Sequence, residues 1–274
     1  MTQSMAKAYQ LAAELINANL SDEEKNSRNS ISNSDILVMQ GEYDQAEDVL
    51  SLLGIPFTLV QPRMLIDLDL LPSQTMIINC PGIVNVRSVS KIAKFVKDGG
   101  MLLTSDWAIK NVLERAFPGV VRYNNHATSD EIVRIEFKKP NSPILAGCSY
   151  PSSELCWWVE ASSYPITVID AGRVEVLLSS RELGDKYGEL PVAVTFQFGC
   201  GRVFHSITHY YMKCTEDKTE RHKSTWRNYI EEIGIEPRII KNPAEYDSLT
   251  TGHLEAAYTS AKLLHNLIVG MRLG

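Results

Sequence analysis

Two stretches of the chain carry side chains that could do chemistry. The first, GGMLLTSDWA, ends with Ser105, Asp106, Trp107 and an alanine, and the second, GCGRVFHSITH, contains His205 and His209. A hydroxyl or carboxylate nucleophile needs a base within about 3 Å. If the chain is an enzyme, we therefore expect Asp106, Ser105 and His205 to be its catalytic residues.

Each of these side chains also has a structural interpretation. Ser105 and Asp106 precede an expected helix, where both residue types cap backbone N–H groups and Asp gains from the helix dipole. We favour capping for Ser105 and a structural role for Asp106. His205 and His209 have the spacing of two zinc ligands on a helix, but His205 falls on an expected strand and no HExxH glutamate is present. We therefore expect no metal site, with His205 facing the cleft and His209 hydrogen-bonded to a neighbouring loop.

Short apolar segments alternate with amphipathic helices in the first half of the main body. This alternation predicts a parallel sheet with helices on both faces, which is a doubly wound α/β fold. Asp44 is expected to cap the first of these helices. The predicted strands cover 36–39, 57–60, 75–79 and 101–104, and the predicted helices 44–53, 88–98 and 107–116.

The second half of the chain has a different pattern. After Pro118 it predicts β-rich, partly antiparallel additions to the sheet, followed by two closing helices. Gly199-Cys200-Gly201 predicts a hairpin turn, because glycine readily adopts the positive φ that such turns require. The strands are expected over 132–137, 174–178, 192–198 and 202–206, and the helices over 223–233 and 254–269.

The carboxyl ends of parallel strands form the ligand-facing edge of such a sheet. The loops expected there cover 40–44, 80–85 and 105–107. Exposed loop acids and lone buried cysteines are common without a function. Trp157 and Trp158 could stack on a sugar ring, although a core or interface role is favoured. Ligand contacts are expected from Glu42, Cys80, Gly82, Trp107 and His209.

The N-terminal segment is expected to stand apart from the main body. Residues 4–20 have apolar side chains at helical spacing, and residues 21–35 form a polar run rich in Ser and Asn. We therefore expect a helical appendage with a flexible linker over residues 1–34, followed by one domain over 35–274. The helix would dock on the main body or on a partner.

Composition excludes several classes of function. The 274 residues carry a net charge of −6, and the basic residues form no clustered face, so nucleic acid is not an expected partner. No apolar segment reaches the length of a membrane helix, and no leader segment is visible, which predicts a cytoplasmic protein that does not contact membranes. The five cysteines include no CxxC pair. They are expected to be reduced thiols, without a disulfide framework.

The order of elements from Ile36 to Ala116, followed by PNSPILAG and PVAVTFQFGCGRVFHSITH, resembles the class I glutamine amidotransferase-like superfamily. The pattern is most similar to its non-amidotransferase branches, including the ThuA-like (trehalose-utilisation) proteins, and covers residues 36–212. The resemblance implies a flavodoxin-like, doubly wound, mostly parallel sheet. It also implies a sharp turn after the fourth strand that carries the nucleophile, and a later strand that supplies a histidine.

The resemblance breaks down at the catalytic positions. The G-x-C-x-G turn of true amidotransferases corresponds to 104–108, where Asp106 replaces the cysteine and Ala108 keeps a small residue. The Q-F-H-P-E stretch corresponds to 203–207, which keeps His205 but lacks the glutamate that orients it. The Cys80-Pro81-Gly82 loop corresponds to the oxyanion turn. Glutaminase chemistry needs a thiolate beside a base, so it is not expected here.

These observations predict a degenerate, non-catalytic protein that binds a small molecule or a protein partner at the carboxyl ends of the strands, without a cofactor. The alternative is a hydrolase acting on a sugar-like or amide substrate, with Ser105 or Asp106 paired to His205. A third possibility is a subunit of a larger assembly, including a homo-oligomer, that docks through the helix at residues 4–20.

Overall fold

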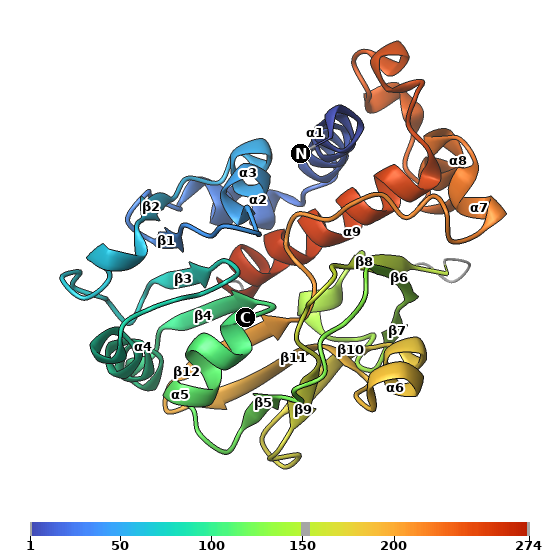
Figure 1. Cartoon of the computed structure of the whole chain (residues 1–274). Coiled ribbons are helices and arrows are strands. Elements are labelled where there is room, and N and C mark those ends of the chain that lie inside the picture. Colours follow the sequence, from blue (N-terminus) through green and yellow to red (C-terminus); the bar gives the residue numbers. More distant parts are fainter. Residues whose placement is uncertain (1, 149–153, 273–274) are drawn as a thin grey trace.

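An eight-stranded mixed sheet forms the centre of the protein in a computed structural model that describes residues 2–148 and 154–272 (Figure 1). The strand order is β2-β1-β3-β4-β12-β11-β10-β7. Neighbours from β2 to β12 are parallel, and the remaining pairs are antiparallel. This arrangement confirms the α/β class. The strands are β1 (Ile36–Met39), β2 (Thr58–Val60), β3 (Thr75–Ile78), β4 (Met101–Ser105), β7 (Glu136–Phe137), β10 (Glu175–Ser179), β11 (Pro191–Phe198) and β12 (Gly201–Ser206).

Helices cover both faces of the parallel half of the sheet. All four side chains of β1 are apolar and buried, as expected for a strand enclosed on both sides. Figure 1 shows α4 (Val86–Asp98) and the short α5 (Glu114–Ala116) on one face, with α1 (Gln3–Ala18), α3 (Ala46–Leu53) and α9 (Thr251–Ile268) on the other. The predicted hairpin is confirmed, because Gly199 has φ +63° between the antiparallel β11 and β12.

Several short elements were not expected from the sequence. The strand predicted over 132–137 is two strands, and two small antiparallel pairs stand outside the main sheet. The pairs are β5 (Val121–Tyr123) with β9 (Ile166–Val168) and β6 (Glu131–Arg134) with β8 (Cys156–Val159). The helix expected over 107–116 is a π-helix at Ile109–Leu113 followed by α5, and the helix expected over 223–233 is α8 (Trp226–Glu232). Further short helices are α6 (Arg181–Tyr187), α7 (Glu220–Lys223) and 3₁₀ turns at Pro62–Met64, Pro143–Leu145, Pro237–Ile239, Pro243–Tyr246 and Gly270–Arg272.

The expected flexible linker at residues 21–35 is wrong. Residues Asp22–Asn29 form α2, and its first turn is closed by a capping box in which Ser21 and Glu24 bond each other's backbone N–H groups. The preceding α1 (Gln3–Ala18) buries eight side chains and packs along α9 in the body of the protein. Among the described residues, no helix combines the length and apolar character needed to span a membrane.

Tyr9 ties α1 to the main body through three polar contacts. Its hydroxyl lies 2.7 Å from the Ser260 hydroxyl, accepts from the backbone N–H of Met212 at 2.8 Å and donates to the Tyr210 carbonyl at 3.2 Å. Removing one partner from a buried set leaves the others unpaired. Tyr9→Phe is therefore expected to lower the free energy of unfolding by about 2 kcal/mol in urea. Tyr43→Phe is the control, since that residue is 47% exposed; equal losses in the two variants would contradict the role of Tyr9.

Candidate functional site

Asp106 occupies a sharp bend directly after β4. Its φ of +45° is in the left-handed region, which non-glycine residues rarely adopt, and its backbone N–H donates to the Ser206 carbonyl at 2.8 Å. The bend also requires small neighbours, because a Cβ on Gly82 would lie 2.8 Å from the Cβ of Ala108. The carboxylate is thereby held at the carboxyl end of the central parallel strands.

The Asp106 carboxylate accepts three hydrogen bonds and lies beside an imidazole. Oδ1 accepts from the backbone N–H of Tyr164 at 2.8 Å, and Oδ2 accepts from the Ser163 hydroxyl at 3.0 Å and the Cys80 thiol at 3.7 Å. Nε2 of His209 lies 3.4 Å from the same Oδ2. The residue is 2% exposed. Its carboxylate thus ties the segment 160–164 and two further strand-end loops to the bend.

Ser105 contacts a second buried carboxylate, that of Asp44. The Ser105 hydroxyl donates to Oδ2 of Asp44 at 2.6 Å and accepts from the backbone N–H of Cys80 at 3.2 Å. The expected helix-capping role of Ser105 is therefore wrong, because its hydroxyl is committed to these two loops.

Asp44 also differs from its expected role. The N-cap residue of α3 is Gln45, without a side-chain cap bond. The Asp44 carboxylate instead accepts from the backbone N–H groups of Gln45 at 2.8 Å, Tyr210 at 3.0 Å and Tyr211 at 3.2 Å. It therefore braces the loop that presents His209.

His205 does not meet Ser105 or Asp106. In the register of β12 and β4, His205 lies beside Thr104, and Ser206 lies beside Ser105. Successive side chains of a strand point to opposite faces, so His205 and Ser105 lie on different faces of the sheet. The imidazole Nδ1 is 2.9 Å from the Thr104 hydroxyl. The catalytic pairing expected from the sequence is not formed.

Burial of His205 makes the fold sensitive to acid. Burial lowers the pKa of His205 from 6.5 to about 3. A histidine with a depressed pKa contributes full stability above its ordinary pKa and loses it as the pH falls from there toward the folded value. Wild type is therefore expected to lose about 2 kcal/mol between pH 8 and pH 5 through this residue.

His205→Leu is expected to remove that part of the pH dependence, because it keeps the volume and has no titrating group. Urea unfolding at pH 8 and pH 5 measures it, with the exposed His126→Gln as control. An unchanged pH slope in His205→Leu would show that His205 stays charged or accessible in the fold.

His209 takes the position beside Asp106 that the sequence analysis assigned to His205. Its Nδ1 lies 3.3 Å from Oε2 of Glu160, so the imidazole stands between two carboxylates. Burial alone would lower the pKa of His209, but the contact with Asp106 and the charges of Asp44 and Glu160 outweigh burial and raise it. His209 was expected to contact a neighbouring loop, and it contacts two, through Asp106 and through Glu160, which was not named from the sequence.

Aromatic rings line the approach to this cluster. Trp107 lies 5.3 Å from both Tyr43 and Tyr164, and Tyr164 stacks on Tyr123 at 3.8 Å. The indole N–H of Trp107 donates to the Ser162 carbonyl at 2.7 Å. These contacts fix the ring of Trp107 at the edge of the cleft.

Two adjoining cavities share Tyr43 and Glu160 as lining residues. One, of about 210 Å³, reaches Cys80, Asp106 and Trp107, and the other, of about 600 Å³, reaches His209, Trp158 and Lys213. The Lys213 ammonium stands 3.9 Å above the Trp158 ring. Trp157 is a core residue bonded to Thr259. The cleft therefore combines carboxylates, an imidazole and aromatic faces.

The residues expected to contact a ligand do not all meet. Cys80, Trp107 and His209 belong to the cleft around Asp106. Glu42 and Gly82 line a separate cavity of about 370 Å³. All five were expected at one edge of the sheet, where they lie, but the sequence does not show that they line two separate cavities.

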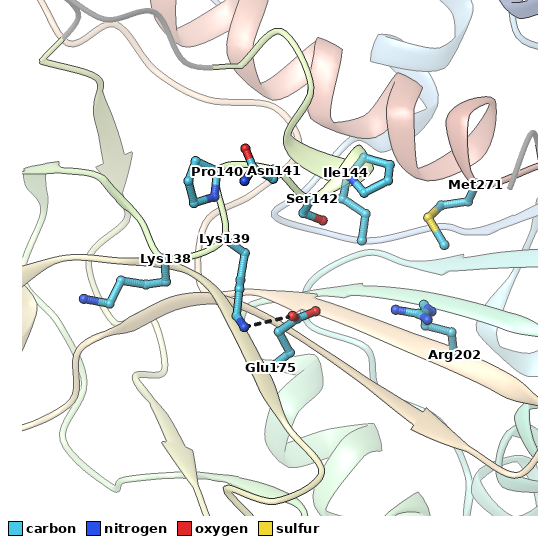
Figure 2. A pocket seen from close by; sticks show the side chains of 10 residues that line it. Lys138, Lys139, Pro140, Asn141, Ser142, Ile144, Glu175, Arg202 and Met271 are labelled. Carbon is cyan, nitrogen blue, oxygen red and sulfur yellow. Dashed lines mark ion pairs between the residues drawn. The ribbon is translucent and has the colours of Figure 1, made fainter.

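A further cavity of about 600 Å³ lies at the opposite ends of the strands (Figure 2). Glu175 and Arg202, at the amino ends of β10 and β12, line it, and Lys139 pairs with Glu175 at 3.5 Å. It is remote from the Asp106 bend. We therefore assign the candidate site to the cleft at the carboxyl ends.

Two clusters of the described residues bring together side chains that can bind a metal ion. One is Cys80, Asp106 and His209, all buried, and the other is Cys214, Glu216 and His253, all partly exposed. Burial and the neighbouring Asp106 raise the pKa of the Cys80 thiol, so without a cation Cys80 is protonated. From the sequence, no metal site was expected.

Comparison with known proteins gives distant structural similarity alone. No family model matches the chain, and no curated protein matches it. A ThuA-like protein from Bacteroides uniformis is 16% identical, with 63% of this chain and 80% of that chain covered and a TM-score of 0.48. A β-galactosidase from Bacillus circulans is 14% identical, with 64% and 28% covered and a TM-score of 0.44. A carbohydrate deacetylase is 11% identical, with 72% and 31% covered and a TM-score of 0.45.

The chain spans less than a third of the glycosidases it resembles, 28% to 31% of their length. Structural similarity at these TM-scores says nothing about the activity of this chain.

Proposed function

We propose that the chain is a degenerate glutamine amidotransferase-like protein, of the ThuA-like kind, that binds a small sugar-like ligand in the cleft at Asp106 without turning it over. Two features support the superfamily. The parallel strands β2-β1-β3-β4-β12 follow the 2-1-3-4-5 order of flavodoxin-like folds. Asp106 also adopts the left-handed bend at the position where the resemblance puts the nucleophile.

The state of the Asp106 carboxylate carries the proposal. A carboxylate offers about four lone-pair sites, and Asp106 uses three of them to accept from the Tyr164 N–H, the Ser163 hydroxyl and the Cys80 thiol. An attacking oxygen must also reach the substrate, and the Asp106 side chain is only 3% exposed. Asp106 therefore acts as an anchor for the loops around the cleft, which leaves the cleft itself for binding.

The lining of the cleft indicates the chemistry of the ligand. Trp107 and Tyr43 line the smaller cavity, and aromatic rings in such a position can stack on the apolar face of a sugar ring. Glu160 contributes a carboxylate that is one-third exposed and can accept hydrogen bonds from hydroxyl groups. The two cavities on either side of Glu160 provide room for one or two rings.

A panel of monosaccharides, disaccharides and simple glycosides tests the proposal, first by thermal shift and then by calorimetry. Glu160→Gln is expected to weaken binding of the best ligand about tenfold, since it replaces charge-assisted hydrogen bonds with neutral ones. Glu42→Gln is the matched control, because Glu42 lines the separate cavity. Absence of binding across the panel, or equal effects of the two variants, would contradict the proposal.

A hydrolase acting on a sugar-like substrate is the second candidate. The observation in its favour is the pairing of His209 with Glu160 at 3.3 Å on the cavity wall, an arrangement suited to acid–base catalysis. In this version of the hydrolase hypothesis, the catalytic base is His209 rather than His205. Product formation that His209→Gln abolishes would favour the hydrolase over the binding protein.

A further inference from the structure

We propose that Cys80, Asp106 and His209 form a Zn²⁺ site beneath the ligand cleft. Cys80 follows β3, Asp106 follows β4 and His209 lies three residues beyond β12, so three strand ends each contribute one ligand. Their Sγ, carboxylate O and imidazole N atoms all lie within 4.8 Å of one another, and all three residues are buried. This proposal goes beyond ligand binding and does not depend on it.

The spacing of the three donor atoms fits a tetrahedral zinc ion. Sγ of Cys80 lies 3.7 Å and Nε2 of His209 lies 3.4 Å from Oδ2 of Asp106. Zinc bonds of about 2.3 Å to sulfur and about 2.0 Å to nitrogen or oxygen give tetrahedral edges of about 3.5 Å for S–O and about 3.3 Å for N–O. The S–O and N–O separations therefore lie close to the edges of a tetrahedral zinc site, and the S–N separation is within 4.8 Å.

The imidazole of His209 indicates a missing partner. Nε2 is buried and has no hydrogen-bond partner among the described residues, because its approach to Asp106 lacks hydrogen-bond geometry. An unpaired buried nitrogen is costly, and a cation between Nε2, Oδ2 and Sγ would satisfy it. The other ring nitrogen, Nδ1, lies 3.3 Å from Oε2 of Glu160. Many zinc-bound histidines are oriented by a carboxylate in this position.

The groups around the three donor atoms, and the charges of these atoms, also favour a zinc ion. The Tyr164 N–H and the Ser163 hydroxyl hold the Asp106 carboxylate from behind. Binding releases the Cys80 thiol proton to solvent, and the thiolate and the Asp106 carboxylate then balance the charge of Zn²⁺. A thiolate and an imidazole favour zinc over the hard cations Mg²⁺ and Ca²⁺.

An open fourth position faces the ligand. Cys80 and Asp106 line the cavity of about 210 Å³ together with Trp107 and Glu160. Three protein ligands with one open position accept water or a ligand oxygen at the metal. The ion would thus hold a hydroxyl or carbonyl oxygen of whatever binds between the aromatic rings.

The second cluster provides a matched control. In the group of Cys214, Glu216 and His253, Nδ1 of His253 already bonds the Thr250 hydroxyl at 2.7 Å, and the three residues are partly exposed. Its cysteine can therefore be replaced without touching the site beside Asp106.

The test uses the full-length protein, stripped with a chelator and loaded with Zn²⁺ or Co²⁺ alone. We expect one bound zinc per chain by elemental analysis after dialysis, and a sulfur-to-cobalt charge-transfer band in the near ultraviolet with Co²⁺. Cys80→Ser is expected to abolish the band and to weaken zinc binding more than about 100-fold. Loss of a residue that only hydrogen-bonds a metal ligand costs about 10- to 100-fold, and Cys80 is a ligand itself. Cys214→Ser is expected to change neither.

Glu160→Gln, which keeps all three ligands, is expected to weaken zinc binding about 10- to 100-fold and keep the cobalt band. Circular dichroism of each variant verifies that it is folded. No retained zinc in the wild type, or a cobalt band that survives Cys80→Ser and disappears in Cys214→Ser, would overturn the site. If the wild type retains no zinc but binds the saccharide, the metal site is wrong and the proposed ligand binding stands.

Discussion

Replacing Asp44 with alanine is expected to lower the free energy of unfolding by about 4 kcal/mol. The Asp44 carboxylate is completely buried and accepts from three backbone N–H groups and the Ser105 hydroxyl. Alanine removes the acceptor and leaves all four donors without it in a site closed to water. The loss is large because each buried donor without a partner costs about 1–3 kcal/mol.

Urea unfolding followed by circular dichroism measures this loss. Asp67→Ala is the control, because that aspartate is exposed. The backbone N–H groups of Tyr210 and Tyr211 donate to Asp44, next to His209 in the same loop. The variant is therefore also expected to weaken the binding of any ligand that contacts His209. A loss below about 1 kcal/mol would mean that the loops are held by contacts other than this carboxylate.

Trp107→Ala is expected to weaken binding of the sugar-like ligand about 30-fold, or about 2 kcal/mol. The indole supplies the aromatic face between Tyr43 and Tyr164, and its N–H holds the Ser162 carbonyl in the segment that carries Glu160. The substitution therefore removes a stacking surface and loosens the acceptor for ligand hydroxyls.

Calorimetric titration of the variant with the best ligand measures the effect. Trp107→Phe is the companion variant, because it keeps a ring and loses only the N–H, and we expect it to fall between wild type and Trp107→Ala. Wild-type affinity in Trp107→Ala would place the ligand elsewhere, for example in the cavity at Glu42.

Much of the fold could be predicted because its central strands are short and uniformly apolar. Strands β1, β3 and β4 were predicted within one residue at each end. The miss at α2 is of a different kind. Its sequence is too polar for an apolar stripe, but Ser21 and Glu24 have capping-box spacing, a signal present in the sequence. The pairs β5–β9 and β6–β8 join segments far apart in the chain, and such pairings leave no local pattern.

The residues of the candidate site could likewise be predicted only in part from the sequence. The bend at Asp106 could be predicted from the glycine-ended helix, the apolar strand and the resemblance of residues 104–108. The choice of His205 over His209 failed because alternation along β12 turns His205 to the other face from Ser105. Glu160 could not be found, since it reaches His209 from a loop 49 positions earlier through tertiary packing alone.

The fate of a bound ligand tests the central claim most directly. The wild-type protein is incubated with its best-binding saccharide for many hours, and the saccharide is then analysed by mass spectrometry. Because the Asp106 carboxylate is buried and accepts hydrogen bonds from Tyr164, Ser163 and Cys80, we predict that the saccharide is recovered unchanged after saturable binding. Conversion of the saccharide by wild type, with no conversion by His209→Gln, would contradict the account and identify the cleft as an active site.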